Sequence, residues 1–390
     1  MNIVVLPNVR YNGHVHCSGN MGILAMLDPQ LSERQLVEQL LETLQALPDV
    51  SARLSAQETG EQGSARRHDA ELSFDVLGSS VTILVEVKKS AFPRDVREFL
   101  WQLKQSGAYR GPVGPQRRAV PLLAAESIST GAKQLLRDER VGYFDTGGSL
   151  FLPARGAYIL IEKPTPKTLA KAVRSFFTGR RSQVLHAMLH RPREWFGVKE
   201  LAEEAMVSPA TASETLSALE RFDWVIARGQ GPAKERCLTE PGALLDAWSR
   251  QTATQRQPTM RRYFVPGVSA EKLLGRVAQA CDAHDAEYAV TYEAAAQCYA
   301  PFLSSLSQVR CRLLGSSAAD AAIGDLDARV VNEGANLVVI EAKSHGDFLF
   351  RERVGSAWLA SPVQVYLDLL RGEGRAKEMA EHLRKERIGF

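Results

Sequence analysis

The sequence predicts an α/β protein built from several domains, and three observations lead to this prediction. Its 390 residues exceed what one ordinary hydrophobic core organises, so about two to four domains are expected. Residues 31–160 and 260–390 each alternate apolar patterns of helical and of strand period, which is typical of mixed sheets covered by helices. Between them lie two short helical patterns and a hairpin pattern, and the apolar-poor residues 251–258 are interpreted as a linker.

The composition is that of a globular protein, with 45% hydrophobic residues, 24% charged residues and a net charge of only +3. Because the charges almost balance, any surface that binds nucleic acid must be local. Five scattered cysteines without a CxxC pair indicate reduced thiols and a cytoplasmic location. No apolar run reaches the length of a transmembrane helix, so no membrane partner is expected. Residues 1–30 are interpreted as an N-terminal arm rather than a signal peptide or a metal site.

The pattern of residues 31–160 predicts helix, hairpin, helix, strand, helix and hairpin. Apolar residues recur at helical spacing over 31–47, after Ser32 as a plausible N-cap. Strands are predicted over 70–77 and 81–87, with a short turn between them. Pro93 is expected to open the next helix, because its missing N–H is tolerated at the first helical position. The remaining elements are predicted at 119–124 (strand), 129–140 (helix), 142–145 (strand) and 150–152 (strand).

Acidic residues alternate along the first strand of this hairpin and precede Glu86-Val87-Lys88 on the second. Alternate residues of a strand share a face, so Asp69 and Asp75 point one way and Glu86 and Lys88 share a face. Cleavage of a phosphodiester needs carboxylates that hold Mg²⁺ or Mn²⁺, because the metal activates a bound water. It also needs a positive group such as a lysine to stabilise the negative charge that develops on the phosphate. The sequence leaves open whether Asp69 or Asp75 faces Glu86, because a slip of one residue in register reverses the face.

This arrangement resembles the PD-(D/E)xK restriction-endonuclease-like superfamily over about residues 31–160. In that superfamily an acidic residue on one strand is followed by an acidic-x-Lys pattern on the next strand, and Glu86-Val87-Lys88 matches the second part. His68 stands where a proline often precedes the first aspartate. The resemblance implies a catalytic set of Asp69, Asp75, Glu86, Lys88 and Gln102, with Asp69, Asp75 and Glu86 as candidate metal ligands. The alternative is a solvated strand face with incidental charges.

A winged helix-turn-helix domain is predicted within residues 163–250. Residues 198–205 form a first helical pattern, and Ser208 and Pro209 have the N-cap and first-position preferences that open a second helix. Two strand patterns around the turn at 229–232 then predict a β-hairpin wing. Just upstream, residues 163–193 hold eight basic residues and no acidic one, the clearest charge asymmetry in the chain.

These parts together predict contact with double-stranded DNA. Because the second helix carries Arg221 only at its far end, we expect small polar contacts with bases, and phosphate contacts from the wing and the basic run. The candidate DNA-binding residues are Arg180, Arg181, Lys199, Ser208, Ala210, Thr211, Ser213, Arg228, Lys234 and Arg236. The alternative is a winged helix that contacts protein. Winged-helix regulators often bind as dimers, but no homodimer interface can be assigned from the sequence.

Residues 286–300, 332–336, 361–369 and 374–383 are similar to the C-terminal half of AbiEi-type antitoxins of type IV toxin–antitoxin systems. The resemblance covers about residues 259–390. It implies a regulator that binds promoter DNA, represses its own operon and opposes a nucleotidyltransferase toxin. The nuclease-like N-terminal part departs from the shorter antitoxins of that family.

Two further patterns in the last part are interpreted as incidental. Gly315-Ser316 followed by Asp325 and Asp327 mimics the nucleotidyltransferase pattern of paired aspartates, and Glu341-Ala342-Lys343 echoes the earlier acidic-x-Lys motif at a strand end. The leading hypothesis is therefore a bacterial, cytoplasmic DNA-binding transcriptional regulator of antitoxin type with a nuclease-like accessory domain. The alternatives are a Mg²⁺-dependent DNA endonuclease targeted by the winged helix, and a scaffold that neutralises a toxin encoded nearby.

Overall fold

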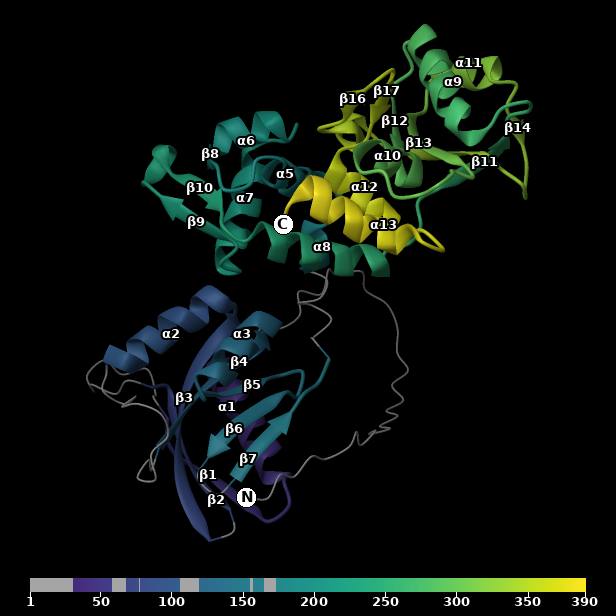
Figure 1. Cartoon of the computed structure of the whole chain (residues 1–390). Helices are drawn as coiled ribbons and strands as arrows, with labels where there is room; N and C mark the ends of the chain where they lie inside the picture. Colours follow the sequence, from purple (N-terminus) through teal and green to yellow (C-terminus); the bar gives the residue numbers. More distant parts are fainter. Residues whose placement is uncertain (1–30, 58–67, 77, 106–118, 155–156, 165–172) are drawn as a thin grey trace, which may run out of the picture. The chain divides into compact units, whose positions relative to one another are not determined.

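A computed structural model describes the chain except for residues 1–30, 58–67, 77, 106–118, 155–156 and 165–172. The predicted N-terminal arm therefore lies outside the described residues. The chain forms two compact units, Met1–Lys171 and Ala172–Phe390 (Figure 1). Both units combine helices with a β-sheet, so the mixed α/β class predicted from the sequence is confirmed. Within the described residues, no helix has the length and apolar content needed to cross a membrane.

The first unit contains a seven-stranded sheet in the sequential order β1 to β7. Strand β3 pairs with β4 and β4 with β5 in parallel, and the other neighbours in this sheet are antiparallel. The strands are β1 (Val50–Gln57), β2 (Ala70–Val76), β3 (Ser79–Ala91), β4 (Ala119–Ile128), β5 (Gly142–Asp145), β6 (Leu150–Ala154) and β7 (Ala157–Ile161).

Helices cover both faces of this sheet, which gives three layers (Figure 1). Helix α1 (Glu33–Gln45) begins at a capping box in which the Ser32 side chain accepts from the Gln35 N–H, and it packs Leu36, Leu40 and Leu44 against one face. Helices α2 (Pro93–Gln105) and α3 (Thr130–Asp138) pack against the other face, where their apolar side chains form one core with those of β4 and β5. The strict alternation of β3 therefore decides which side chains lie under which helix.

The second unit begins with a helix and a short strand that are not predicted from the sequence, followed by two helices and a β-hairpin in the predicted order. Its elements are α5 (Gly179–His190), β8 (Trp195–Gly197), α6 (Val198–Glu204), α7 (Pro209–Arg221), β9 (Val225–Arg228), a 3₁₀ turn (Gly231–Ala233), β10 (Glu235–Leu238) and α8 (Pro241–Thr254). Ser208 caps α7 by accepting from the Thr211 N–H. Gly229 has φ +73°, and a Cβ there would lie 2.7 Å from the Ala233 carbonyl oxygen, so the turn of the wing requires glycine.

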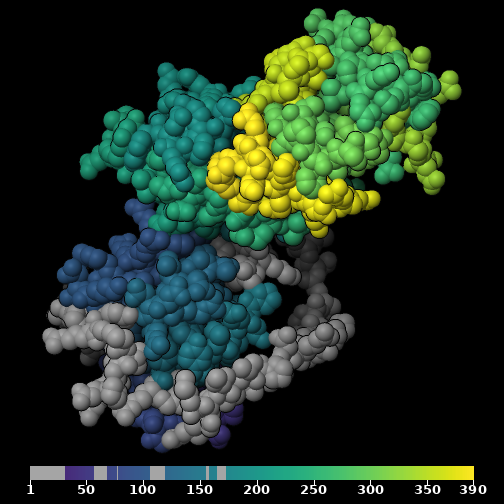
Figure 2. Space-filling model, in the orientation of Figure 1, coloured from purple at the N-terminus to yellow at the C-terminus, as the bar shows by residue number. Residues whose placement is uncertain are grey.

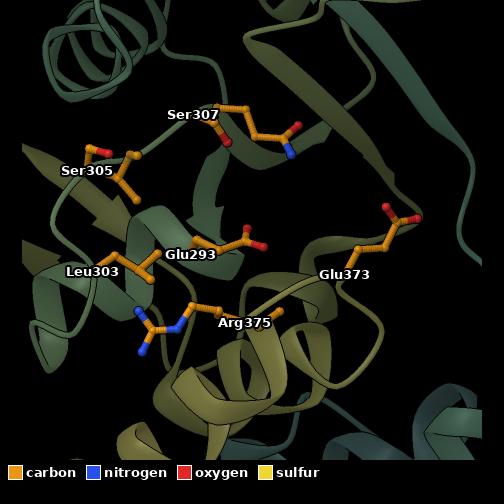
Figure 3. Close-up of a pocket in the computed structure, with 9 residues that line it drawn as sticks. Glu293, Leu303, Ser305, Ser307, Glu373 and Arg375 are labelled. Carbon is orange, nitrogen blue, oxygen red and sulfur yellow. The ribbon is translucent and has the colours of Figure 1, made fainter.

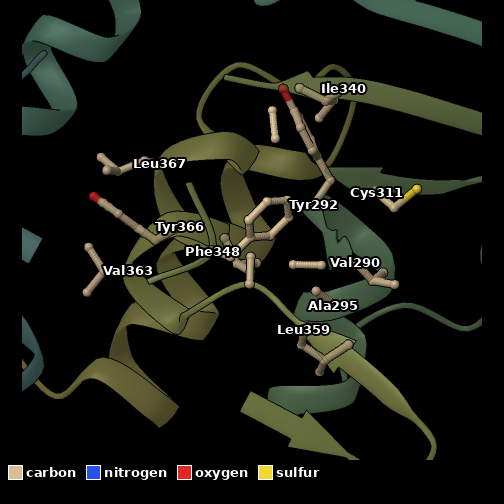
Figure 4. Packing of buried hydrophobic residues seen from close by; sticks show 14 of the residues in the cluster. Val290, Tyr292, Ala295, Cys311, Ile340, Phe348, Leu359, Val363, Tyr366 and Leu367 are labelled. Carbon is tan, nitrogen blue, oxygen red and sulfur yellow. The ribbon is translucent and has the colours of Figure 1, made fainter. Parts of the chain in front are cut away.

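The rest of this unit is a mixed seven-stranded sheet in the order β14-β11-β15-β13-β12-β17-β16, with helices around it. The strands are β11 (Met260–Phe264), β12 (Tyr288–Thr291), β13 (Val309–Leu314), β14 (Arg329–Val330), β15 (Leu337–Ala342), β16 (Glu352–Val354) and β17 (Ala357–Leu359). The helices are α9 (Ala270–Ala283), α10 (Tyr292–Tyr299), α11 (Ser317–Asp325), α12 (Pro362–Leu369) and α13 (Ala376–Leu383), with a 3₁₀ helix at His345–Phe348 and a π-helix at Arg384–Ile388. Figure 4 shows Tyr292, Val363 and Tyr366 among its core side chains.

The buried apolar side chains of residues 176–254 and of the C-terminal segment form one hydrophobic core. In the space-filling view, the C-terminal residues in yellow lie against the teal surface of the preceding helices (Figure 2). His186 of α5 lies 2.5 Å from the Ser361 hydroxyl at the start of α12. The Arg384 guanidinium donates to the Asp246 carboxylate of α8 at 2.6 Å. Helix α8 continues through Thr254, and Thr252 is buried, so the first half of the expected linker is helical and packed.

Candidate functional site

Asp69 lies beside Glu86 across the β2–β3 pair. Its backbone N–H donates to the Val85 carbonyl oxygen at 2.9 Å, and its carboxylate oxygen Oδ2 accepts from the Val87 N–H at 2.6 Å. Asp69 is thus held against both chain neighbours of Glu86. The two carboxylates lie close enough for the charge of Asp69 to raise the pKa of Glu86.

Asp75 lies far from this pair. It is opposite Ser80 in the β2–β3 register, next to the hairpin turn. It follows Asp69 by six residues, which corresponds to about 20 Å along an extended strand. Of the two aspartates that the sequence left open, the structure therefore brings Asp69 to Glu86 and keeps Asp75 away. Asp75 does not fit as a ligand of a metal shared with Glu86.

The surroundings of Glu86 raise the pKa of its carboxyl group. Partial burial is the largest cause that raises its pKa, the charge of Asp69 adds to it, and Glu33 contributes further. Lys88 acts in the opposite direction, because its Nζ lies 3.2 Å from Glu86 Oε1. One ammonium thus faces several carboxylates, and the excess negative charge favours a proton or a cation at Glu86.

Glu33 is a residue of this environment that the sequence reasoning missed. It is the first residue of α1, directly after the N-cap Ser32, where an acidic side chain is explained by the helix dipole alone. Its position becomes relevant only because α1 packs against β3 and β4 with its N-terminal end near the end of β4, where the Leu31 N–H donates to Glu126 at 3.0 Å. That packing brings the Glu33 carboxylate close enough for its charge to raise the pKa of Glu86.

The described residues contain no group of three or more His, Cys, Asp or Glu side chains that is placed to hold a metal ion. What Asp69 and Glu86 offer is a pair of carboxylates, and one oxygen of Asp69 already accepts a backbone N–H. Mg²⁺ commonly keeps several water ligands and takes one or two carboxylates from protein. The pair therefore fits a Mg²⁺ or Mn²⁺ ion that retains much of its hydration.

Gln102 lies on the exposed side of α2, whose buried side is formed by Val96, Phe99 and Leu100. No hydrogen bond among the described residues joins Gln102 to Glu86 or Lys88. The structure therefore brings together Asp69, Glu86 and Lys88 of the predicted set and leaves Gln102 at the surface.

Helix α7 presents a polar face to solvent. Ser208 and Ala210 are exposed, Thr211 and Ser213 are half-buried, and Leu216 and the other apolar residues of the helix point into the core. The Ser208 hydroxyl lies 3.0 Å from the Thr211 hydroxyl and also caps the helix, so part of its hydrogen-bonding capacity is already used. The start of this helix is thus a surface of small polar and methyl groups.

Arg236 does not meet the expectation of a phosphate contact. It is only 5% exposed, and its Nε donates to Glu220 Oε1 at 2.9 Å. Lys234 donates to the same carboxylate at 3.0 Å. Burial by itself raises the pKa of Glu220, but the hydrogen bonds from Arg236 and Lys234 outweigh it and lower the pKa. The triad ties the wing to α7, and strand alternation turns Arg236 inward.

The other predicted basic residues remain at or near the surface. Arg228 donates to Glu235 at 2.7 Å and stacks over the Trp195 ring at 4.2 Å, while its side chain is 55% exposed. Arg181 pairs with Glu214 at 3.3 Å, and Lys199 lies 4.0 Å from Glu203. Arg180 is exposed at the start of α5. Exposed pairs of this kind contribute little, so phosphates can replace the glutamates as partners.

Part of the basic run has a structural role instead. Arg191 lies within 3.3 Å of glutamates 194, 200 and 204, which raise its pKa, and it covers the Phe196 ring at 4.7 Å. It therefore joins the end of α5 to α6. Lys167 and Lys171 of the same run lie outside the described residues.

A pocket of about 280 Å³ lies in the C-terminal segment (Figure 3). Glu293, Glu373, Arg375 and the hydroxyl groups of Ser305 and Ser307 line it. None of these residues belongs to either predicted site. Its mixed charges suit a small polar molecule.

The two incidental patterns have structural roles. Ser316 caps α11 by accepting from the Ala319 N–H at 3.1 Å, and Asp325 accepts a hydrogen bond from His284 at 2.6 Å. The Lys343 N–H donates to Asp347 at 2.6 Å, which closes a turn after β15. These contacts give Ser316 and Asp325 structural roles that need no ligand.

No family model, curated protein or solved structure matches this chain. The fold and the sites therefore define the protein only as a mixed α/β chain. One of its units carries a strand-borne carboxylate pair with a lysine, and the other carries two successive helices, α6 and α7, followed by the β9–β10 hairpin.

Proposed function

We propose that this protein is a DNA-binding transcriptional regulator of antitoxin type that binds duplex DNA with its winged-helix segment. The observation that carries the proposal is the exposed polar start of α7, which comes after the turn that ends α6 and precedes the wing. In helix-turn-helix proteins the second helix enters the major groove, and its first residues contact base edges. Ala210, Thr211 and Ser213 occupy those positions here.

Phosphate contacts are expected from Arg180, Lys199 and Arg228. Arg236 and Lys234 instead hold the wing in place through Glu220. With about three phosphates neutralised, the logarithm of the binding constant should fall with the logarithm of salt concentration with a slope of about −3. Binding is therefore expected to be moderate and strongly dependent on salt.

The test is a fluorescence anisotropy titration of the full chain against duplex DNA from upstream of its own gene. Arg180→Ala combined with Arg228→Ala should weaken binding at least tenfold and reduce the salt slope by about 2, because two phosphate contacts are lost. Arg261→Ala is the matched control, since Arg261 is an exposed arginine on β11. If wild type shows no salt-sensitive preference for that DNA over unrelated duplex, the proposal is wrong. Co-purification with the product of a neighbouring gene tests the toxin partner separately.

A second candidate function is metal-dependent cleavage of a phosphodiester by the first unit. The observation that favours it is the position of Asp69, which the Val85 carbonyl and the Val87 N–H hold beside Glu86 and Lys88. A divalent ion between the two carboxylates would polarise the phosphate and activate a water molecule. Lys88 would stabilise the charge that develops on the phosphate.

Calorimetric titration of Mn²⁺ tests this candidate, with a DNA cleavage assay on the same samples. Glu86→Gln and Asp69→Asn should each abolish Mn²⁺ binding and cleavage, because each removes one of two carboxylates. Asp75→Asn is the matched control on the same strand, and it should bind Mn²⁺ like wild type because Asp75 lies opposite Ser80. Equal loss in all three variants, or no Mn²⁺ binding by wild type, would contradict a site at Asp69 and Glu86.

A further inference from the structure

Trp101 is an exposed aromatic side chain of the first unit. It lies on α2 with 61% of its surface exposed. The positions three and four residues away on a helix share its face, and here they hold Arg97 and Lys104, with Arg94 one turn earlier. One stripe of α2 therefore combines three basic side chains with one open aromatic ring.

The charge around this stripe is locally positive. Residues 88–105 contain five Lys or Arg and two Asp or Glu, so this short segment carries the same net charge of +3 as the whole chain. One of the two acids, Asp95, turns back to accept from the Phe92 N–H at 3.0 Å. Lys104 lies 3.2 Å from Glu139, and its side chain is 52% exposed, so a phosphate can compete with this solvated pair.

The stripe and the carboxylate pair belong to the same side of the sheet. Glu86 and Lys88 are in register with Leu123 and Ala125 of β4, and both of these pack in the core beneath α2 and α3. Strand β3 leads into α2 within two residues, between Ala91 and Pro93. In Figure 1 α2 lies over the sheet next to α3. A chain of phosphates along α2 would therefore lead toward Lys88 and Glu86.

We propose that this face of α2 binds single-stranded nucleic acid, with a base stacked on Trp101 and phosphates held by Arg94, Arg97 and Lys104. Aromatic platforms in a basic groove bind single strands because every unpaired base has an open face. In a duplex those faces are covered by neighbouring base pairs, so the stripe favours an unpaired strand. Binding of a single strand by α2 does not depend on either proposed function. Only cleavage of the bound strand would rest on the second candidate function, metal-dependent cleavage by the first unit.

The experiment measures the tryptophan fluorescence and the anisotropy of the full chain with labelled oligo(dT). The other four tryptophans lie in the second unit, so the difference between wild type and Trp101→Phe isolates the Trp101 signal. Oligo(dT) should quench this signal, and Trp101→Ala should weaken oligo(dT) binding about 5- to 150-fold. Trp101→Phe should retain part of the affinity, because a smaller ring still stacks.

Tyr158→Ala is the matched control, since Tyr158 is another aromatic residue of the first unit, with 52% exposure. It should bind oligo(dT) like wild type. Duplex binding is measured in the same samples to separate single-strand binding at α2 from duplex binding at α7. Trp101→Ala should leave the affinity for duplex unchanged, whatever the affinity of wild type for duplex is. The inference is overturned if oligo(dT) does not bind, if Trp101→Ala binds as tightly as wild type, or if blunt duplex quenches Trp101 as strongly as oligo(dT).

Discussion

At the residue scale, partners decide what each charged side chain does. Glu86 and Glu220 are both carboxylates within strongly charged surroundings, but the pKa of Glu86 is raised and that of Glu220 is lowered. Burial acts on both in the same direction. The difference is that Glu86 faces Asp69 and one lysine, whereas Glu220 faces an arginine and a lysine. The surroundings of Glu86 therefore favour the protonated carboxyl group, whereas Glu220 is held as a carboxylate by its two basic partners.

Removal of Glu220 should therefore destabilise the second unit strongly. Glu220→Ala leaves Arg236 buried without this carboxylate, which costs about 3–5 kcal/mol of unfolding free energy. Urea denaturation of the full chain measures it. Glu235→Ala, which removes the partner of the exposed Arg228, should cost less than about 1 kcal/mol. If both changes cost the same, the Glu220 triad does not hold the wing.

At the element scale, local signals predicted helices and strands within residues 31–152 and 198–238, whereas β1, β7, α5, β8 and most of the separate elements after residue 260 were not predicted. Ser32 and Ser208 cap helices, and Pro93 and Pro209 begin them, because these preferences depend only on neighbouring backbone groups. Strand pairing depends on more distant groups. The turn before Ser79 sets the β2–β3 register, and that register makes Asp69 the neighbour of Glu86.

The cap of α7 has a measurable effect. Ser208→Ala removes the acceptor for the Thr211 N–H, so the unfolding free energy of the second unit should fall by about 0.5–2 kcal/mol. Ser217→Ala is the control on the exposed face of the same helix, and it should change stability by less than about 0.5 kcal/mol. Chemical denaturation of the two variants and of wild type compares them directly. Equal losses would show that the Ser208 hydroxyl does not cap the helix.

At the scale of the whole molecule, residues 176–254 are not separate from the C-terminal segment. Their apolar side chains form one core, and His186 sits inside it between Trp248 and Phe350. Burial is the largest cause that lowers the pKa of His186, to about 3, so this imidazole is neutral in the folded protein. In the unfolded chain it takes up a proton near its ordinary pKa of about 6.5.

The second unit should therefore lose stability as pH falls from about 6.5 toward 3, because protons bind the unfolded chain more readily at His186. His186→Gln, which stays neutral, should flatten this part of the stability profile even if it lowers stability at pH 7. Thermal unfolding of the full chain between about pH 7 and pH 4 measures the slope. His345→Gln is the control, because His345 is an exposed histidine of the same unit. An unchanged slope in His186→Gln would contradict the assignment.

From the sequence alone came the α/β class, the helix and strand order over much of residues 70–152, the two helices and hairpin within residues 198–238, and the Glu86-Val87-Lys88 strand. These depend on periodicity and capping, which act within a few residues. Tertiary structure alone decided that Asp69 rather than Asp75 meets Glu86, that Glu33 joins their field, and that Arg236 turns inward to Glu220. Each of these depends on strand register or helix packing, which bring together residues that are distant along the chain.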